Sequence, residues 1–466
     1  MNELSPFFVD VRSRRKALRM PQAVLAKAAG LSSNYIMRIE RGLLVPSADQ
    51  TQALERVLGA LPKAGMARIS GEGYVTSMSA EGRLIRRVRN HDIGLRPVWD
   101  LFCGVGGFSA GFEATGEFEV VAGLDLLGDR LDTFTANHGA ANAYGGDIRN
   151  IAVDTLLNEN ERPFAVIGGP PCQGFSSIRP FRNVEWGDLR NNLAEEFCRV
   201  VAAARPKWLV FENVVGLLTH NGGKTLEALQ GAFEGLGYRT SARVMNAAFH
   251  GLPQRRERLI IVGSLEGKSF EWPVPTHNHS RRSMAGSSRL LLAPQLGLLE
   301  TAEPAVTLLD AIGNLPLVLA GQTADEYLDV VETRYQELIR AGADVLTMHD
   351  ATAHSSEMLN IIRHAGDNIN ALPLGMVTSG FSSCYSRLAP NEPANTITVN
   401  FVHPASNRCI HPYQDRALTP REGARLQGFP DTFGFLGTRS QVVKQIGNAV
   451  PPILGRCIAE ALLDAD

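Results

Sequence analysis

The chain has 466 residues, of which 44% are hydrophobic and 20% are charged, and its formal net charge is −2. This length allows a large buried core and predicts two or three domains. No apolar run is long enough to cross a membrane, and the first residues lack the apolar core of a secretion signal, so we expect a cytoplasmic protein. The six cysteines form no Cys-x-x-Cys pair, which indicates neither a disulfide framework nor a zinc site, and we expect no metal.

Four short helices are expected near the N-terminus, at residues 11–19, 21–30, 31–42 and 47–59. Gly30 is suited to end the second of them, because glycine readily adopts the left-handed conformation that closes a helix. With its LAKAAGLS turn and IERG ending, the segment resembles the helix-turn-helix of the Cro/repressor family of DNA-binding domains. That family places the second helix of the pair in the major groove, which implies contacts from Ser32, Ser33, Asn34, Met37 and Arg38. A small helical bundle used for dimerisation is the alternative.

The charge is distributed unevenly along the chain. Residues 1–96 contain 16 Lys and Arg but only 8 Asp and Glu, a net charge of +8, so the remaining residues carry −10. A basic segment suits contact with a polyanion, although a solvated basic face explains the charge equally well. We expect the helix-turn-helix domain to occupy residues 1–62 and a linker to follow at residues 63–95, which show no clear period and contain the basic run RLIRRVRN.

After the linker, short apolar runs alternate with helix-length segments. The runs VWDLF, EVVAGLD, FAVIGG, KWLVFEN and RLIIVGS are rich in β-branched residues and read as strands. Their alternation with helices predicts an α/β fold with a doubly wound, mostly parallel sheet across residues 96–276. The period is lost at residues 277–412, which are expected to form a smaller inserted domain, and residues 413–466 are expected to complete the first domain.

A glycine-rich turn, CGVGGFSAGF, follows the first strand. Gly104 and Gly106 would let a ligand approach the backbone closely at the N-terminus of a helix. Asp125 ends the next strand about 20 residues later, where an acidic side chain can bind ribose hydroxyls, so an adenosine-containing cofactor fits. A tight strand-to-helix turn beside an ordinary surface aspartate would produce the same pattern.

Reactive side chains are expected at the ends of three further strands. Cys172, in GGPPCQGFSS, is expected at the carboxyl end of a strand and is a candidate nucleophile, although a lone cysteine is more often a small buried hydrophobe. The next strand ends in Glu212 and Asn213, which suggests an acid beside the thiol, whereas Glu212 alone would be read as a solvated residue. Arg256 and Arg258 stand two apart and so share one face of a strand, either at a site or along a salt-bridged edge.

Together these segments resemble the cytosine-5 DNA methyltransferase family. The resemblance rests on DLFCGVGGFSAGF, GGDI, GGPPCQGFSS, FENV, QRRERL, RALTPREGARLQGFPDTF and QIGNAVPP, which occur in the family's order between residues 99 and 453. It implies a Rossmann-like methyltransferase domain that binds S-adenosylmethionine, through positions that include Phe102, Gly104, Asp125, Asp147, Ile148, Pro171, Leu193 and Asn448. It also implies that residues 277–412 are the target-recognition domain. The family more often has Glu where Asp125 stands and Ala or Ser where Cys103 stands, so the ribose contact departs from the pattern.

The resemblance also implies a mechanism. Cys172 adds as a thiolate to carbon 6 of cytosine, because carbon 5 is otherwise too poor a nucleophile to take a methyl group. Glu212 supports ring nitrogen 3 if burial keeps it protonated, Asn213 helps to position Glu212, Arg258 holds the carbonyl oxygen, and Arg256 supports the pocket. The reacting atoms are unreachable in a stacked duplex, so the cytosine must be flipped out of the DNA.

We therefore expect a bacterial, nucleoid-associated DNA methyltransferase of a restriction-modification system, with double-stranded DNA as its partner. The N-terminal domain is expected to bind an operator as a dimer and to regulate transcription of its own gene. One alternative is an RNA cytosine-5 methyltransferase, against which the repressor-like domain argues, because that fold reads B-form DNA. The other is a transcription regulator with an inactive methyltransferase body, against which the filled catalytic positions argue.

Overall fold

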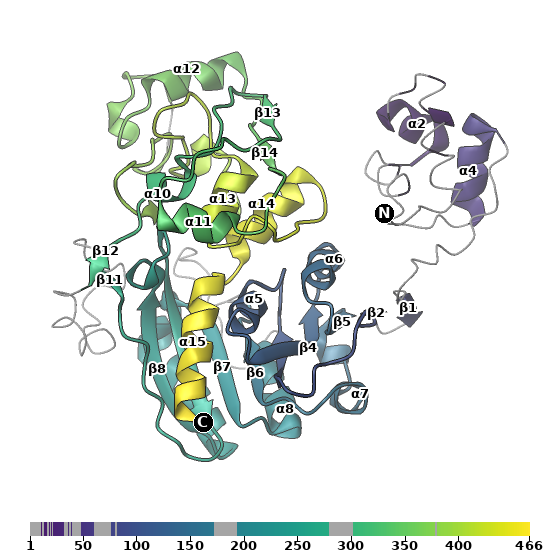
Figure 1. Ribbon diagram of the computed structural model, residues 1–466, viewed down its shortest axis with the longest axis vertical. Helices are drawn as coiled ribbons and strands as arrows, with labels where there is room; N and C mark the ends of the chain where they lie inside the picture. The colour runs from purple at the N-terminus through teal and green to yellow at the C-terminus, as the bar shows by residue number, and fades with distance from the viewer. Residues whose placement is uncertain are drawn as a thin grey trace. The chain divides into compact units, whose positions relative to one another are not determined.

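The computed structural model describes residues 76–79, 82–171, 193–278, 302–377 and 380–466. It also describes residues 22–31 and 48–59 and seven single positions between 11 and 39. The chain divides into two compact units, residues 1–75 and residues 76–466. Each unit is described by itself below (Figure 1).

The N-terminal unit is a small helical domain with its own apolar core. Its described helices are α2 (Gln22–Ala29) and α4 (Ala48–Leu58). Leu25, Ala26, Ile36 and Ile39 lie in its core with Val11, Leu54 and Leu58. Gly30 follows α2 with φ +68°, and the amide of Leu31 donates to the carbonyl of Ala26, so Gly30 ends the helix as predicted.

A nine-stranded sheet organises the larger unit, in the order β1-β2-β5-β4-β3-β6-β7-β10-β8. The five central strands from β5 to β7 run parallel, whereas β10 runs antiparallel to both of its neighbours and β2 runs antiparallel to β5. The strand bounds are β1 Thr76–Ser79, β2 Gly82–Ile85, β3 Arg96–Leu101, β4 Phe118–Asp125, β5 Asn142–Gly145, β6 Ala165–Gly168, β7 Trp208–Val214, β8 Arg239–Asn246 and β10 Glu257–Ser264. The five strands expected from the sequence correspond to β3, β4, β6, β7 and β10.

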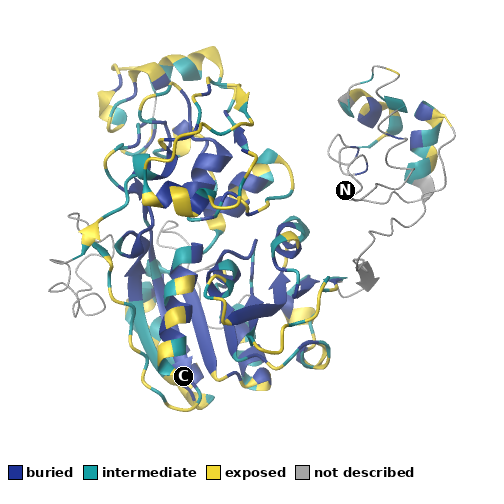
Figure 2. Ribbon diagram, in the orientation of Figure 1, coloured by how far each residue is buried: buried dark blue, intermediate teal, exposed yellow. Residues whose placement is uncertain are grey.

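Helices cover both faces of this sheet, because its central strands carry apolar side chains on both sides (Figure 2). Alternate residues face opposite clusters: Trp208 and Val210 of β7 point to one side, Leu209 and Phe211 to the other. One cluster includes α5 (Gly107–Glu113), α6 (Gly128–Asn137) and α15 (Pro452–Ala465). The other includes α7 (Val153–Glu159), α8 (Leu193–Ala204) and α9 (Lys224–Gly235). The predicted doubly wound α/β fold is confirmed, with a sheet that is parallel in its centre and antiparallel toward both edges.

A second lobe is inserted between β10 and α15 and has a core of its own (Figure 1). Its helices are α10 Leu308–Ile312, α11 Arg334–Arg340, α12 Ser356–His364, α13 Pro420–Leu426 and α14 Arg439–Asn448. Side chains of α10, α11, α13 and α14 share one buried cluster. The second core therefore extends past the boundary expected at residue 412. Of the helices after that boundary, α15 adds its apolar side chains to a cluster of the sheet domain, and α14 contacts α6 through hydrogen bonds of Gln445 with Thr133 and with the carbonyl of Asp129.

Short strand pairs complete the described structure. They are β9 Gln254–Arg255 with β15 Ala394–Asn395, β11 His277–Asn278 with β12 Glu303–Pro304, and β13 Thr323–Ala324 with β14 His349–Asp350. The parallel β9/β15 pair joins the segment before β10 to the second lobe. Within the part of the chain that the structure describes, no helix is both long and apolar enough to cross a membrane.

Part of the segment expected to be a linker is sheet. Residues 76–79 and 82–85 form β1 and β2, and β2 pairs with β5 at the edge of the sheet. The arginines of the basic run bind acidic side chains of the sheet domain: Arg83 to Asp132 at 2.7 Å, Arg86 to Glu159 at 2.8 Å, Arg87 to Glu161 at 3.0 Å, and Arg89 to Glu119. This stretch of the positive charge therefore fastens an edge strand to the domain, and its arginines already have carboxylate partners.

Candidate active site

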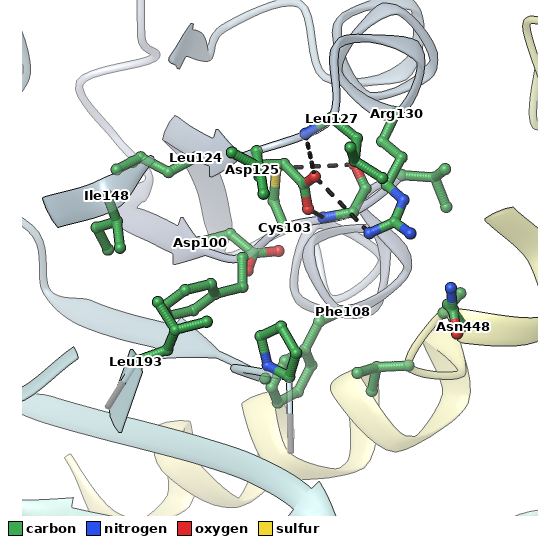
Figure 3. A pocket seen from close by; sticks show the side chains of 18 of the residues that line it. Asp100, Cys103, Phe108, Leu124, Asp125, Leu127, Arg130, Ile148, Leu193 and Asn448 are labelled. Carbon is green, nitrogen blue, oxygen red and sulfur yellow. Dashed lines mark hydrogen bonds and ion pairs between the residues drawn. The ribbon is translucent and has the colours of Figure 1, made fainter. Parts of the chain in front are cut away.

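A cavity of about 600 Å³ opens at the carboxyl ends of the parallel strands (Figure 3). Its wall is built by the turns after β3, β4, β5 and β6, by the start of α8, by Glu212 of β7 and by the end of α14. Eight of the nine predicted cofactor-binding residues line it: Phe102, Gly104, Asp125, Asp147, Ile148, Pro171, Leu193 and Asn448. Segments far apart in the sequence thus meet at the sheet edge where open α/β folds bind ligands.

The glycine-rich turn gives the cavity one of its walls. Phe102 and Gly104 both have positive φ, +65° and +57°, and such a conformation costs energy for a non-glycine residue and recurs at functional sites. Gly106 does not line the cavity. Its φ is +87°, and a Cβ built there would lie 2.1 Å from Nε2 of His138, so packing against His138 requires a glycine at this position.

Asp125, at the end of β4, is held by two backbone amides. Gly104 donates to Oδ2 at 3.0 Å and Leu127 donates to Oδ1 at 2.9 Å. Burial raises the pKa of Asp125 above its ordinary value, although the Arg130 charge and the two amides oppose that shift. The carboxylate has about four lone-pair directions, so two remain for a ligand after the amides are bound.

Asp147 and Asn448 lie on other parts of the wall. Asp147 caps the short helix Ile148–Asn150 by accepting from the amide of Arg149, and its hydrogen bond with the Arg149 side chain lowers the pKa of the carboxyl. Asn448 is the exposed last residue of α14. The cavity thus combines apolar surface from Ile148 and Leu193 with four carboxyl groups and two carboxamides, those of Asp100, Asp125, Asp147, Glu212, Gln445 and Asn448.

Glu212 and Arg258 form an ion pair across adjacent antiparallel strands. In the register of β7 and β10, Glu212 stands opposite Ile260 and Arg258 opposite Val214, so both side chains project from the same face. Nε of Arg258 lies 2.8 Å from Oε1 of Glu212, and the two side chains are only 14% and 10% exposed. The Glu212 carboxyl can therefore contact a ligand in the cavity, while the guanidinium of Arg258 fixes the orientation of that carboxyl.

Asn213 and Arg256 connect the site to neighbouring segments. The side-chain amide of Asn213 donates to the carbonyl of Pro170 at 3.1 Å, which ties β7 to the segment before Cys172. Arg256 is buried and donates to the carbonyls of Ile397, Gly447 and Ala449 at 3.2, 3.3 and 3.0 Å. Burial lowers the pKa of Arg256, and the Arg258 charge adds to that shift. Arg256 therefore anchors the chain on both sides of Asn448.

Cys172 lies outside the described residues, as do the predicted DNA contacts Ser32, Ser33, Asn34, Met37 and Arg38. The described chain reaches Pro171, directly before Cys172, at the cavity wall. Gly169 lies so near the carboxyl of Glu212 that an added Cβ would be 2.6 Å from Oε2. The approach to Cys172 and the predicted acid are therefore in contact through Gly169.

Asp100 and Arg130 are among the cavity residues that the sequence interpretation did not single out. Asp100 is 1% exposed and accepts a hydrogen bond of 2.6 Å from the Ser109 hydroxyl, and burial raises its pKa to about 7. A charged residue inside the apolar strand VWDLF was a signal that could have drawn attention to it. Arg130, in the first turn of α6, also lines the cavity and carries no sequence signal, because its position depends on how α6 packs. Among the described residues, no group of His, Cys, Asp and Glu side chains is arranged to hold a metal ion.

The profile of the C-5 cytosine-specific DNA methylases matches residues 97–464, which is most of the chain. The chain belongs to the C-5 cytosine-specific DNA methylase family. The predicted recognition of this family and the predicted enzyme class, a DNA (cytosine-5-)-methyltransferase, are confirmed. A helix-turn-helix profile matches residues 10–68, which confirms the predicted N-terminal domain.

Individual methylases are similar over the same region. Type II methyltransferase M1.HphI of Haemophilus parahaemolyticus is 35% identical over 370 residues, covering 78% of this chain and 86% of that protein. Type II methyltransferase M.AgeI of Thalassovita gelatinovora is 31% identical, covering 78% of this chain and 98% of its own length. A solved Escherichia coli prophage protein, inferred to be a DNA modification methyltransferase, superposes with a TM-score of 0.60 at 24% identity, covering 79% of this chain and 99% of its own. That likeness shows the shared methyltransferase fold.

Proposed function

We propose that this chain transfers a methyl group from S-adenosylmethionine to carbon 5 of a cytosine within a specific duplex DNA sequence. The observation that carries the proposal is the Glu212–Arg258 pair, which stands at the same cavity as the carboxylates suited to an adenosine-containing cofactor. The kinship with type II methyltransferases supports a place in a restriction-modification system.

The cavity fits S-adenosylmethionine in size and chemistry. About 600 Å³ lies within the usual range of small-molecule pockets. Asp125 retains acceptor capacity for the ribose hydroxyls, and Asp147 is an acceptor for the adenine amino group. Phe102, Ile148 and Leu193 offer apolar surface for the base, with Gly104, Pro171 and Asn448 completing the wall. When bound, the cofactor supplies an electrophilic methyl group.

The chain's own residues make cytosine reactive. We assign Cys172 as the nucleophile whose thiolate forms a bond to carbon 6, which displaces the electrons of the 5,6 double bond into the ring. Glu212 donates a hydrogen bond or proton at nitrogen 3, which accepts that charge and leaves carbon 5 nucleophilic toward the methyl group. Arg258 binds the ring carbonyl oxygen and keeps Glu212 in place. Loss of the carbon 5 proton then releases Cys172 and restores the double bond.

Asn213 and Arg256 fix the positions of the segments that carry the reacting groups. Asn213 binds the carbonyl of Pro170, so the segment leading to Cys172 is fixed to the strand that carries Glu212. Arg256 binds backbone on either side of Asn448, which fixes the far wall of the cavity. Pre-organisation of this kind contributes to catalysis because the reacting groups need not be ordered during the reaction.

The DNA must present its cytosine outside the helix, at a cost of a few kcal/mol for unstacking. We assign target recognition to residues 277–412, which form the first part of the inserted lobe, with base-edge contacts choosing the site and basic side chains binding phosphates. The choice of lobe rests on its position: it is joined to the catalytic strands through the β9/β15 pair, directly before Arg256 and Arg258.

A methyl-transfer assay tests this function directly. The full chain is incubated with tritiated S-adenosylmethionine and either duplex DNA or total RNA, and modified DNA is sequenced after bisulfite treatment. We expect label in DNA at one sequence motif, loss of activity in Cys172→Ala, and activity near that of the parent in Cys198→Ala. Label in RNA alone, or none in either substrate, contradicts the proposal.

We propose a second function, operator binding, for the N-terminal unit. It is supported by the helix-turn-helix match at residues 10–68 and by an apolar core separate from that of the enzyme. Such domains act as dimers on two half-sites one helical turn apart. Footprinting on DNA upstream of the gene should reveal a protected site that Asn34→Ala with Arg38→Ala weakens, while the methylated motif stays the same. A changed motif or no protected site contradicts it.

A further inference from the structure

The Arg130 guanidinium stands at the cavity without a hydrogen-bond acceptor among the described residues. Its ion-pair partner among the described residues is Asp125, with Nη1 3.8 Å from Oδ1, which is beyond hydrogen-bond distance. The side chain is 24% exposed and lines the cavity, and Figure 3 shows it beside Asp125, across from Ile148 and Leu193. An arginine has five N–H donors, so those of Arg130 are available to a ligand.

Arg149, the other arginine at the cavity wall, is differently placed. Its Nε donates to both oxygens of Asp147, at 2.9 and 3.0 Å, and Nη2 also contacts that carboxylate. Arg149 is therefore hydrogen-bonded to a protein carboxylate, whereas Arg130 lies near the carboxylate of Asp125 without a hydrogen bond to it. The difference identifies Arg130 as the cavity cation able to contribute to ligand binding.

We infer that Arg130 and Asp125 together bind the ribose diol of the cofactor, with the hydroxyls donating to Asp125 and their oxygens accepting from Arg130. This inference rests on the proposed use of S-adenosylmethionine. Two polar atoms 3.8 Å apart cannot bond each other well, yet both can reach one hydroxyl oxygen at about 2.7–3.0 Å. A hydroxyl is the group that donates and accepts at once, so it satisfies both side chains.

A ligand carboxylate fits this place poorly. It would have to lie against the buried carboxylate of Asp125, and two like charges in a desolvated site repel each other. Burial already raises the pKa of Asp125, so the site tolerates little further negative charge. A neutral diol brings no charge, and the Arg130 donors compensate for the short reach of an aspartate whose oxygens each accept a backbone amide.

Binding measurements with non-reacting probes test the inference. By calorimetry, Arg130→Gln should bind S-adenosylhomocysteine about 10- to 100-fold more weakly than the parent, the usual effect of losing a hydrogen bond to a charged group. It should bind 5′-methylthioadenosine more weakly by the same factor, because that probe keeps the diol but lacks the amino-acid carboxylate. The difference in affinity between Arg130→Gln and the parent should shrink to within about threefold for at least one of two further probes, the 2′-deoxy and the 3′-deoxy forms of S-adenosylhomocysteine.

The outcomes separate the inference from the proposed function. Arg456→Gln, which removes a charge from an exposed pair on α15, should bind every probe as the parent does. Equal weakening for all probes, or weakening for S-adenosylhomocysteine but not for 5′-methylthioadenosine, overturns the diol contact while leaving the methyltransferase intact. A parent protein that binds neither S-adenosylmethionine nor S-adenosylhomocysteine overturns the proposed function itself. An unchanged thermal midpoint in Arg130→Gln shows that the fold is retained.

Discussion

Arg258 holds Glu212 at 2.8 Å from the neighbouring antiparallel strand, and both side chains are almost buried. The two residues are diagonal partners in the β7/β10 register, so the sheet itself sets their spacing. Glu212 also lies against Gly169, near the start of the segment that carries Cys172. Its carboxyl is therefore oriented by the scaffold before any substrate binds, which is the condition for an efficient acid.

Glu212→Gln should lower the methylation rate by about 10²- to 10⁴-fold, because an amide can accept from Arg258 but cannot protonate the ring. Affinity for S-adenosylhomocysteine should stay within about twofold. Single-turnover methylation and calorimetry measure the two quantities. Glu227→Gln, an exposed change on α9, is the matched control and should behave as the parent. Turnover within a few-fold of the parent would remove Glu212 from the mechanism.

Gly169→Ala should disturb the same carboxyl from the other side. The added Cβ would lie 2.6 Å from Oε2 of Glu212, so either the carboxyl or the strand end must move. We expect a rate loss of at least tenfold with a nearly unchanged thermal midpoint. Gly231→Ala in α9, where an added Cβ meets nothing within 4 Å, should keep full activity and gain up to about 1 kcal/mol of stability. Full activity in Gly169→Ala would contradict the contact.

Substitutions of Arg256 and Arg258 should have different effects on stability and on the methylation rate, although both arginines were predicted as site residues. Arg256→Lys can satisfy fewer of the three carbonyls, so it should lower the free energy of unfolding by about 2–4 kcal/mol and weaken cofactor binding. Arg258→Lys should leave stability within about 1 kcal/mol and lower the methylation rate. Chemical denaturation and rate measurements distinguish them, and the reverse pattern would exchange their roles.

Duplex DNA containing 5-fluorocytosine at the target should become covalently attached to Cys172. Fluorine cannot leave as the carbon 5 proton does, so elimination stalls and the adduct survives denaturing electrophoresis. Among the described residues, Cys103 is the cysteine that lines the cavity, but burial raises the pKa of its thiol well above the ordinary range and keeps it protonated. We expect no adduct with Cys172→Ala and an adduct with Cys103→Ala. An adduct that persists in Cys172→Ala disproves the assignment.

The sequence was informative where function and local pattern coincide. Short β-branched runs predicted four of the five central strands and also β10, and the glycine turn with Asp125 predicted one wall of the cavity, because strand ends and turns carry local signals. The strands β1 and β2 escaped prediction because each has only four residues and depends on pairing with its neighbour in the sheet and on ion pairs such as Arg83–Asp132. No local pattern reports such distant partners.

Tertiary packing also explains the remaining differences. The α13 and α14 helices were expected to complete the first domain, but their apolar side chains complete the core of the second lobe. Gly106 fits a ligand-binding turn by sequence, yet its space is taken by His138, 32 residues away. The sequence does not distinguish Arg130 from other helical residues, because its position near Asp125 depends on how α6 packs. Each case depends on contacts between segments that the sequence does not bring together.

The second lobe contains a buried ion pair that should make it sensitive to acid. Nη1 and Nη2 of Arg416 donate to the two oxygens of Glu422 at 2.8 and 2.7 Å, and both side chains are at most 1% exposed. Burial alone would raise the pKa of Glu422, but the Arg416 charge and hydrogen bonds outweigh it and hold the pKa far below its ordinary value. The unfolded chain therefore takes up a proton at Glu422 more readily than the folded protein does.

This difference fixes the sign of the pH dependence. Stability from the pair is present above the ordinary glutamate pKa and is lost as pH falls below it, by up to about 1.4 kcal/mol for each pH unit. Between pH 5 and pH 3 the thermal midpoint should fall less steeply in Glu422→Gln than in the parent. The variant should also be less stable at pH 7, by about 3–5 kcal/mol, because Arg416 is left buried without its partner. Glu460→Gln, from the exposed Arg456–Glu460 pair, should keep the parent's slope. Identical slopes for the parent and Glu422→Gln would show that the buried pair does not govern the acid response.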